Sequence, residues 1–152
     1  MSGKIISGTM ADPVAMNRID HMEARIFALG GEWAAFGETI NLAPVRHHFT
    51  PGLYSREIFM PAGSAITSKI HKTRHPFVVS QGKCFVYMGG DSWVTITAPH
   101  FGITEPGTRR VLLVLDDTIW TTFHVTSLTD VAEIEREILE DYTNPLLEEV
   151  VA

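Results

Sequence analysis

The feature that most constrains the fold is a long series of short β-prone runs between residues 32 and 126. Turn-forming residues interrupt the series at Pro51-Gly52, at Pro61 and at Pro106-Gly107. No helical periodicity separates the runs. Many short strands with frequent turns are typical of an antiparallel sandwich or barrel. The expected strands are 32–36, 39–42, 53–60, 65–71, 77–79, 83–88, 92–98, 109–115 and 119–126.

A helix is expected on each side of this series. Asp12-Pro13 supplies a cap and a first-turn proline, and Ile19, Met22 and Ile26 follow at helical spacing. Thr129-Asp130 begins a second apolar stripe, whose opposite face is acidic and therefore solvated. We predict a single domain of 152 residues. Its parts are a flexible leader (1–11), a helix (12–30), a β-barrel (32–126), a helix (129–142) and a tail (143–152).

Charge and composition exclude several classes of protein. The net charge is −6 and no basic stripe stands out, so we expect no nucleic-acid partner. No run approaches the ~20 apolar residues of a membrane helix, so we expect no membrane partner. The one cysteine, Cys84, cannot form an intrachain disulfide and fits a reducing compartment. We therefore expect a cytoplasmic protein.

Two histidines lie close together in the stretch 63–82. His71 and His75 are four residues apart, and turn signals at Gly63 and Gly82 frame them. Neutral imidazole is a good ligand for zinc, iron, nickel and manganese. The spacing favours a metal site at the mouth of the barrel. The alternative is that both are ordinary polar loop residues, because they bracket a predicted turn.

This stretch resembles the first motif of the cupins. The spacing of that motif is reproduced by Gly63, Lys69, His71, His75 and Gly82. Lys69 stands where the motif has its first histidine, and His75 stands where it has glutamate. Downstream, APHFGITEPGTRR resembles the second motif, with Arg110 in place of its last histidine ligand. The resemblance implies a mainly β, single-domain jelly-roll barrel that holds a divalent metal ion: zinc, iron, nickel or manganese.

Two further expectations accompany the resemblance. The phrases PGLYSREIFMPAG and WTTFH are similar to small uncharacterised cupin-like proteins of phage genomes, which would act in the host cytoplasm. Jelly-roll sheets also leave edges and faces that partner chains commonly cover. We therefore expect a homodimer.

A third histidine could replace the missing ligand. If residues 116–118 turn a tight hairpin, Arg110 lies opposite His124 on the neighbouring strand. Directly opposed residues of an antiparallel pair project to the same face. His124 would then point into the barrel and complete a metal site with His71 and His75. Three imidazoles that leave a position for water or substrate are a recognised arrangement for catalytic zinc.

The remaining predicted site residues surround this metal. We predict Glu57 and Arg110 as catalytic residues, and Lys69, Arg110 and Tyr54 as substrate-binding residues. Arginine pairs well with a carboxylate or a phosphate. Tyr54 and Glu57 are three residues apart on one strand, so they face opposite sides and only one can face the barrel interior.

Two functions of different class remain open. The first is a metal-binding cupin that acts on or binds a small polar, anionic molecule, with the metal as Lewis acid or oxygen-activating centre. The alternative is a non-catalytic cupin, a binding or structural module that could be associated with a phage particle. The loss of the usual glutamate and of one histidine favours the second. The three histidines favour the first.

Overall fold

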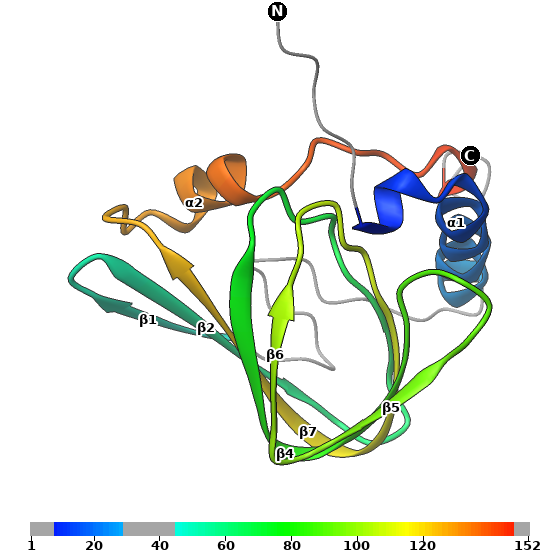
Figure 1. Ribbon diagram of the computed structural model, residues 1–152, viewed down its shortest axis with the longest axis horizontal. Coiled ribbons are helices and arrows are strands. Elements are labelled where there is room, and N and C mark those ends of the chain that lie inside the picture. The colour runs from blue at the N-terminus through cyan, green and yellow to red at the C-terminus, as the bar shows by residue number, and fades with distance from the viewer. Residues whose placement is uncertain (1–7, 29–44, 148–152) are drawn as a thin grey trace, which may run out of the picture.

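The computed structural model describes residues 8–28 and 45–147, which form a curled antiparallel sheet with a helix on each of two sides (Figure 1). A short 3-10 helix (Gly8–Ala11) and α1 (Pro13–Ala28) come first. The strands are β1 (Val45–Thr50), β2 (Leu53–Met60), β3 (Ala65–Thr67), β4 (His75–Tyr87), β5 (Val94–Thr97), β6 (His100–Thr104) and β7 (Val111–Val125). The last helix is α2 (Val131–Ile138).

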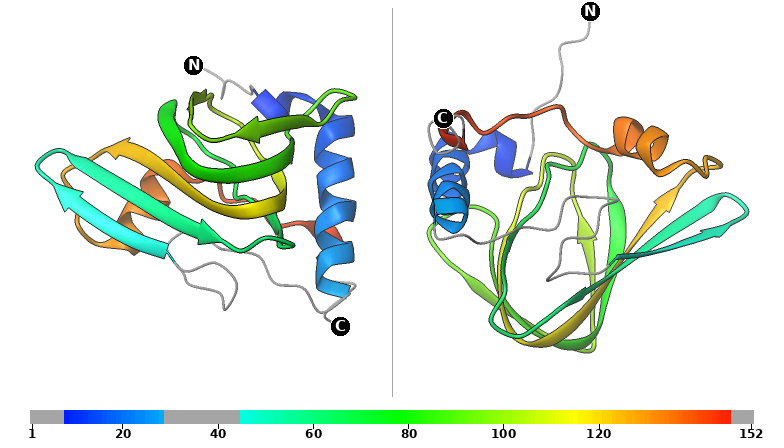
Figure 2. Two further views of the ribbon diagram at one scale, coloured as in Figure 1. Left: turned by 90° about the horizontal axis from the view of Figure 1, so that it is seen from below. Right: turned by 180° about the vertical axis from the view of Figure 1, so that it is seen from behind.

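The two longest strands, β4 and β7, pair with each other and form the spine of the sheet. The strand order is β1-β2-β7-β4-β5, and β3 and β6 pair with further parts of β7 and β4. Each long strand thus pairs with one short strand near its start and with another near its end. The sheet curls around an interior (Figure 2). The predicted mainly β fold is confirmed, although the described strands form an open barrel that does not close.

Both spine strands bend at the same place. The register of β4 against β7 shifts between Val79 and Cys84, opposite Asp116 and Thr118. Gly82 has a φ of +98°, and a Cβ there would collide with Thr118. Only glycine fits this close approach without a shift. The predicted hairpin at residues 116–118 is wrong: β7 is one strand, and its exposed aspartates lie on the outside of a bend.

Alternation of side chains fills the interior. Along β2, Tyr54, Arg56, Ile58 and Met60 are buried, whereas the residues between them are partly exposed. The main core consists of Ile58, Met60, Ile66, Phe77, Val79, Cys84, Val86, Ile96, Leu112, Val114 and Trp120. Buried polar groups border this core, since the guanidinium of Arg110 lies over the rings of Phe77 and Trp120.

The two helices pack against separate parts of the barrel (Figure 1). In α1, Ile19 packs with Tyr87 and Val111. In α2, Ile138 packs in a cluster with Tyr54. Gly8–Ala11 form a 3-10 helix with Thr9 buried, in the segment predicted as a flexible leader. No helix in the described part of the chain is long and apolar enough to span a membrane.

Several predicted boundaries differ from the structure. The strand 53–60 agrees with β2, whereas the predicted runs 77–79 and 83–88 are both parts of β4. β1, which contains His47-His48, and β6 lie where no strand is expected from the sequence. The predicted strands 32–36 and 39–42 lie outside the described residues.

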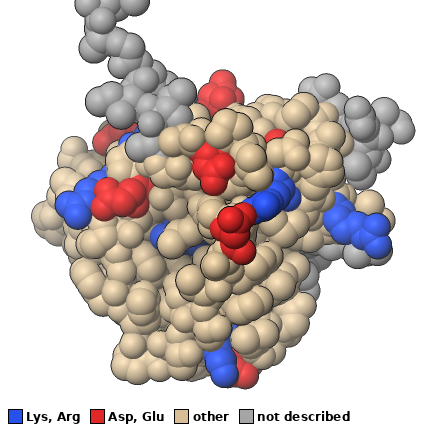
Figure 3. Space-filling model, turned by 45° about the vertical axis from the view of Figure 1, so that its right-hand side comes forward, with Lys and Arg blue, Asp and Glu red and all other residues tan. Residues whose placement is uncertain are grey.

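On the face that Figure 3 draws, basic and acidic side chains are interspersed over a mostly uncharged surface.

A buried ion cluster ties α1 and the C-terminal segment to the barrel. The guanidinium of Arg109 donates to Asp20 Oδ1 at 2.7 Å and to Glu23 Oε1 at 3.2 Å. Tyr142 Oη donates to Asp20 at 2.7 Å, and Asn144 Nδ2 donates to Glu23 at 3.1 Å. Every charged group of the cluster is buried and has an oppositely charged partner. Such a cluster is costly to break, because removal of one member leaves an uncompensated charge.

We predict that Glu23→Ala lowers the free energy of unfolding by about 3–5 kcal/mol, because the guanidinium of Arg109 stays buried with only one carboxylate. The matched control is Glu105→Ala, which removes an exposed ion pair of 2.8 Å to Arg74. That change should cost less than about 1 kcal/mol. Denaturant-induced unfolding measures both. Equal losses in the two variants would contradict a structural role for the buried cluster.

Candidate metal centre

Three histidines from separate elements meet inside the barrel. His71 lies in the β3–β4 connection, His75 begins β4, and His124 is close to the end of β7. The ring centroids of His75 and His124 are 4.4 Å apart, those of His71 and His75 are 4.8 Å apart, and those of His71 and His124 are 6.5 Å apart. All three side chains are buried. The structure therefore brings together the predicted metal ligands.

Backbone hydrogen bonds on two sides hold His71 in place. Its N–H donates to Thr108 O at 3.2 Å, and its carbonyl accepts from Gly107 N at 2.7 Å. On the other side it forms a bridge with Leu139, just beyond α2. The turn predicted at Pro106-Gly107 thus holds the backbone of His71 in place. This explains why residues far apart in sequence are needed to build the site.

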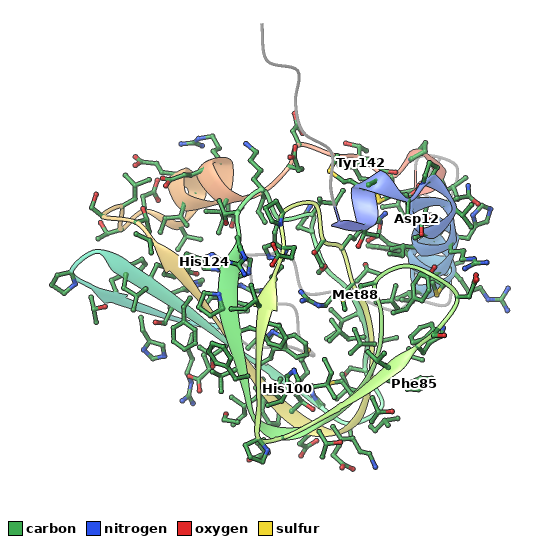
Figure 4. The ribbon with its side chains drawn as sticks, viewed as in Figure 1. Asp12, Phe85, Met88, His100, His124 and Tyr142 are labelled. Atoms are coloured by element: carbon green, nitrogen blue, oxygen red, sulfur yellow. The ribbon has the colours of Figure 1, made fainter. Side chains whose placement is uncertain are left out.

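His75 and His124 are held by the strands themselves. His75 pairs with Thr104 of β6, and its Nδ1 bonds to Thr73 O at 3.0 Å. His124 pairs with Tyr54 of β2, whose ring stacks on it with a centroid separation of 5.8 Å. His124 Nε2 bonds to Thr122 Oγ1 at 2.9 Å. Figure 4 shows His124 at one end of the sheet and His100 at the other, so His100 is not part of the cluster.

The ring nitrogens fit metal ligation. A carbonyl oxygen only accepts, so Nδ1 of His75 carries its proton and Nε2 keeps its lone pair. That Nε2 and Nδ1 of His71 are buried, and neither has a hydrogen-bond partner among the described residues. A ligating histidine commonly donates its other ring N–H to a carbonyl. However, within residues 8–28 and 45–147 no three His, Cys, Asp or Glu side chains already have positions from which they could hold one metal ion.

All three imidazoles are neutral at pH 7. Burial lowers the pKa of His75 to about 4, with a smaller contribution from the charge of Arg110. Burial, followed by repulsion from the protonated form of His75 and from Arg56, lowers the pKa of His124 to about 3. Burial, followed by repulsion from the protonated form of His75 and from Arg110, holds the pKa of His71 well below its usual value. Neutral imidazole is the form that binds a metal.

A pocket of about 60 Å³ opens beside His71. Arg56 and Arg110 are buried in its lining, and burial lowers the pKa of each guanidinium to about 10, so both remain charged at pH 7. Lys69 lines the pocket at its partly exposed side. The pocket lining contains no acidic side chain among the described residues. The site is therefore cationic.

Two of the predicted site residues have different positions from those expected. Glu57 lies on the outer face of β2, where its carboxylate contacts His48 Nε2 at 3.2 Å, and it does not line the pocket beside His71. Tyr54 is fully buried, and its hydroxyl bonds to His47 Nδ1 at 2.5 Å. It stacks on His124 and does not line the pocket. The residue that sequence reasoning missed is Arg56, which shares the inner face of β2 with Tyr54.

His124 faces inward for a different reason from the predicted one. No hairpin places it opposite Arg110. Arg110 immediately precedes β7, and the inner face of that strand then carries Thr118, Trp120, Thr122 and His124. Even-numbered residues of a single strand share one face except where a bend intervenes. The expected outcome, an inward His124 on the same side as Arg110, is therefore observed.

We predict that the metal-free protein loses stability as the pH falls from 7 to 5. The unfolded histidines take up protons near pH 6.5, whereas folded His75 and His124 do so only near pH 4 and 3. The unfolded state thus binds more protons, and each histidine contributes up to about 1.4 kcal/mol per pH unit. Unfolding in chelator at several pH values measures the slope. His75→Gln should flatten it and His21→Gln, an exposed control, should not; identical slopes would contradict the prediction.

Comparisons with known proteins identify the fold. No protein-family model matches the chain, and no curated protein matches it in sequence. Ectoine synthase from P. lautus has 15% identity and a TM-score of 0.53, over 66% of this chain and 75% of that one.

Salicylate 1,2-dioxygenase from Pseudaminobacter salicylatoxidans has 12% identity and a TM-score of 0.51, over 80% of this chain and 34% of that one. A Klebsiella pneumoniae protein with a double-stranded β-helix domain has 13% identity and a TM-score of 0.50, over 61% of this chain and 84% of that one. The chain has the double-stranded β-helix fold of the cupins.

Proposed function

We propose that this protein binds a divalent metal ion through His71, His75 and His124, and a small anionic molecule beside it. The observation that carries the proposal is the meeting of three buried neutral imidazoles with the cationic pocket of Arg110. Three nitrogen donors suit zinc, iron, nickel or manganese. When bound, the ion would supply a Lewis acid that polarises an oxygen of the ligand.

The protein's own side chains have distinct parts in this proposal. Arg110 would orient the anion, and Lys69 would attract it at the partly exposed side of the pocket. The Thr73 carbonyl keeps the proton of His75 on Nδ1, and the ring of Tyr54 fixes the orientation of His124. Among the described residues, the pocket lining offers no carboxylate to move a proton. Binding and orientation are therefore the functions to which the described residues contribute.

Electrostatics makes the two ligands interdependent. The positive charges of Arg110 and Arg56 contribute to the lowered pKa of His71, and they would oppose a metal cation in the same way. A bound anion would offset that opposition, so anion binding should strengthen metal binding, and the reverse, by the same factor. A second candidate function follows from the same observation: a metal-free module in which the pocket holds the anion alone.

The homodimer and the phage origin remain predictions. A homodimer would cover exposed apolar side chains such as Phe101, which is 65% exposed on β6, and Ile103 beside it. If the chain is a phage protein that acts in the host cytoplasm, that origin would be consistent with the alternative function, a binding or structural module.

Elemental analysis of the untagged protein, purified without chelator, tests the proposal. We predict a near-stoichiometric divalent transition metal that is lost in His71→Ala. His100→Ala is the matched control, because His100 lies at the other end of β6 from Thr104, the partner of His75, and should leave the metal content unchanged. Metal-free protein in all three samples, with no thermal stabilisation by added metal, would reject the metal centre and leave the metal-free module.

A further inference from the structure

Two consecutive buried arginines differ in their counterions. Arg109 pairs with the carboxylates of Asp20 and Glu23 at 2.7 and 3.2 Å. Within residues 8–28 and 45–147, Arg110 has no ion pair with any carboxylate. Both side chains are at least nine-tenths buried. A buried cation without an anion is costly, so a protein that retains one has a reason to keep it.

The guanidinium of Arg110 is held in place without being neutralised. It lies over the rings of Phe77 and Trp120, at 5.0 and 5.6 Å from their centroids. Its Nη2 donates to Thr104 Oγ1 at 3.1 Å, and its buried Nε has no partner among the described residues. Aromatic faces and one hydroxyl fix the orientation of the group and leave donor capacity unused. Such a group is pre-organised for an anion.

The wall of the pocket next to Arg110 is apolar. Its lining includes Ile58, Met60, Ile66, Leu112 and Trp120. A phosphate ion is hydrophilic on all sides and would lose hydration against such a wall. A carboxylate with a hydrocarbon body has one charged end for an arginine and an apolar remainder for the wall. The lining therefore selects among anions by the apolar part of the ligand.

We infer that the pocket binds a small monocarboxylate with an apolar body, its carboxylate on Arg110 and its body along the wall of Ile58, Ile66 and Leu112. This inference rests on the proposed function and specifies the chemical class of its anion. Arg109, although adjacent in sequence, does not line this pocket, and its charge is already matched by Asp20 and Glu23.

Calorimetric titration with matched small molecules tests the inference on the unmodified protein. Butyrate should bind about 10- to 100-fold more tightly than butyramide, which has the same size but no charge. Affinity should rise about fourfold per methylene from acetate to butyrate, because each added methylene is buried. Inorganic phosphate should bind more weakly than butyrate. Each titration is done with and without zinc.

Variants assign the effect to Arg110. Arg110→Met keeps the length of the side chain and should remove the preference for butyrate over butyramide, whereas Arg110→Lys should keep part of it. The control Arg74→Met alters an exposed arginine on the outside and should leave butyrate affinity unchanged. Circular dichroism establishes that each variant is folded. If Arg110→Met does not fold, the ligand comparison on the unmodified protein still decides the question.

The outcomes separate this inference from the proposed function. Equal affinity for butyrate and butyramide, no gain with chain length, or no binding at all would overturn the inference. Tighter binding of phosphate than of butyrate would also overturn it but would leave an anion site in place. Zinc bound at the histidines without any carboxylate binding would leave the metal centre standing alone. Carboxylate binding without zinc would support the inference and favour the metal-free module.

Discussion

The pairing of β4 with β7 is the interaction on which the rest of the structure depends. Each strand bends once, at Gly82 and opposite Thr118, so that its two halves serve different parts of the curled sheet. Both halves of each strand contribute to the apolar core, and one half of each also carries His75 or His124. The two imidazoles lie two residues beyond the paired Phe77 and Thr122, so the strand register of β4 against β7 brings them together.

The interior contains two kinds of buried cation, one paired with carboxylates and one without such a partner among the described residues. At Arg109 the protein supplies two carboxylates from α1, and the result is a structural tie. Arg110 has no ion pair with a carboxylate of the described residues, and the result is a cationic pocket with neutral imidazoles beside it. Buried charge of the first kind stabilises a unique arrangement of elements, whereas the second kind is characteristic of binding sites.

The sequence predicts those features that depend on local pattern. The alternation in 53–60 and its flanking turns give β2 correctly, and the glycines of the cupin-like motif mark real requirements, since Gly63 and Gly82 both have positive φ. The false hairpin at 116–118 shows the limit of local pattern. Polar, turn-forming residues suit the outside of a bent strand as well as the tip of a hairpin, and only the partner strand distinguishes the two.

The sequence predicts the three histidines of the site but not all of its other residues, because local pattern does not show which face of a strand is inside. Strand parity shows that Tyr54 and Glu57 face opposite sides, but which side is inside depends on tertiary packing. The inward Arg56 runs against the usual preference of charged residues for the surface, so its burial could not be predicted from residue type. Arg109 and Arg110 could not be told apart, because the carboxylates that match Arg109 lie 86 and 89 residues away in the chain.

The central claim is that the histidine cluster, and not another group of histidines, is the metal centre of this fold. Anomalous diffraction at the zinc edge from crystals grown with zinc tests it most directly. The account predicts one strong peak bounded by the imidazoles of His71, His75 and His124. A peak at His47 or His48 of β1, or no ordered peak beside His71, would contradict it.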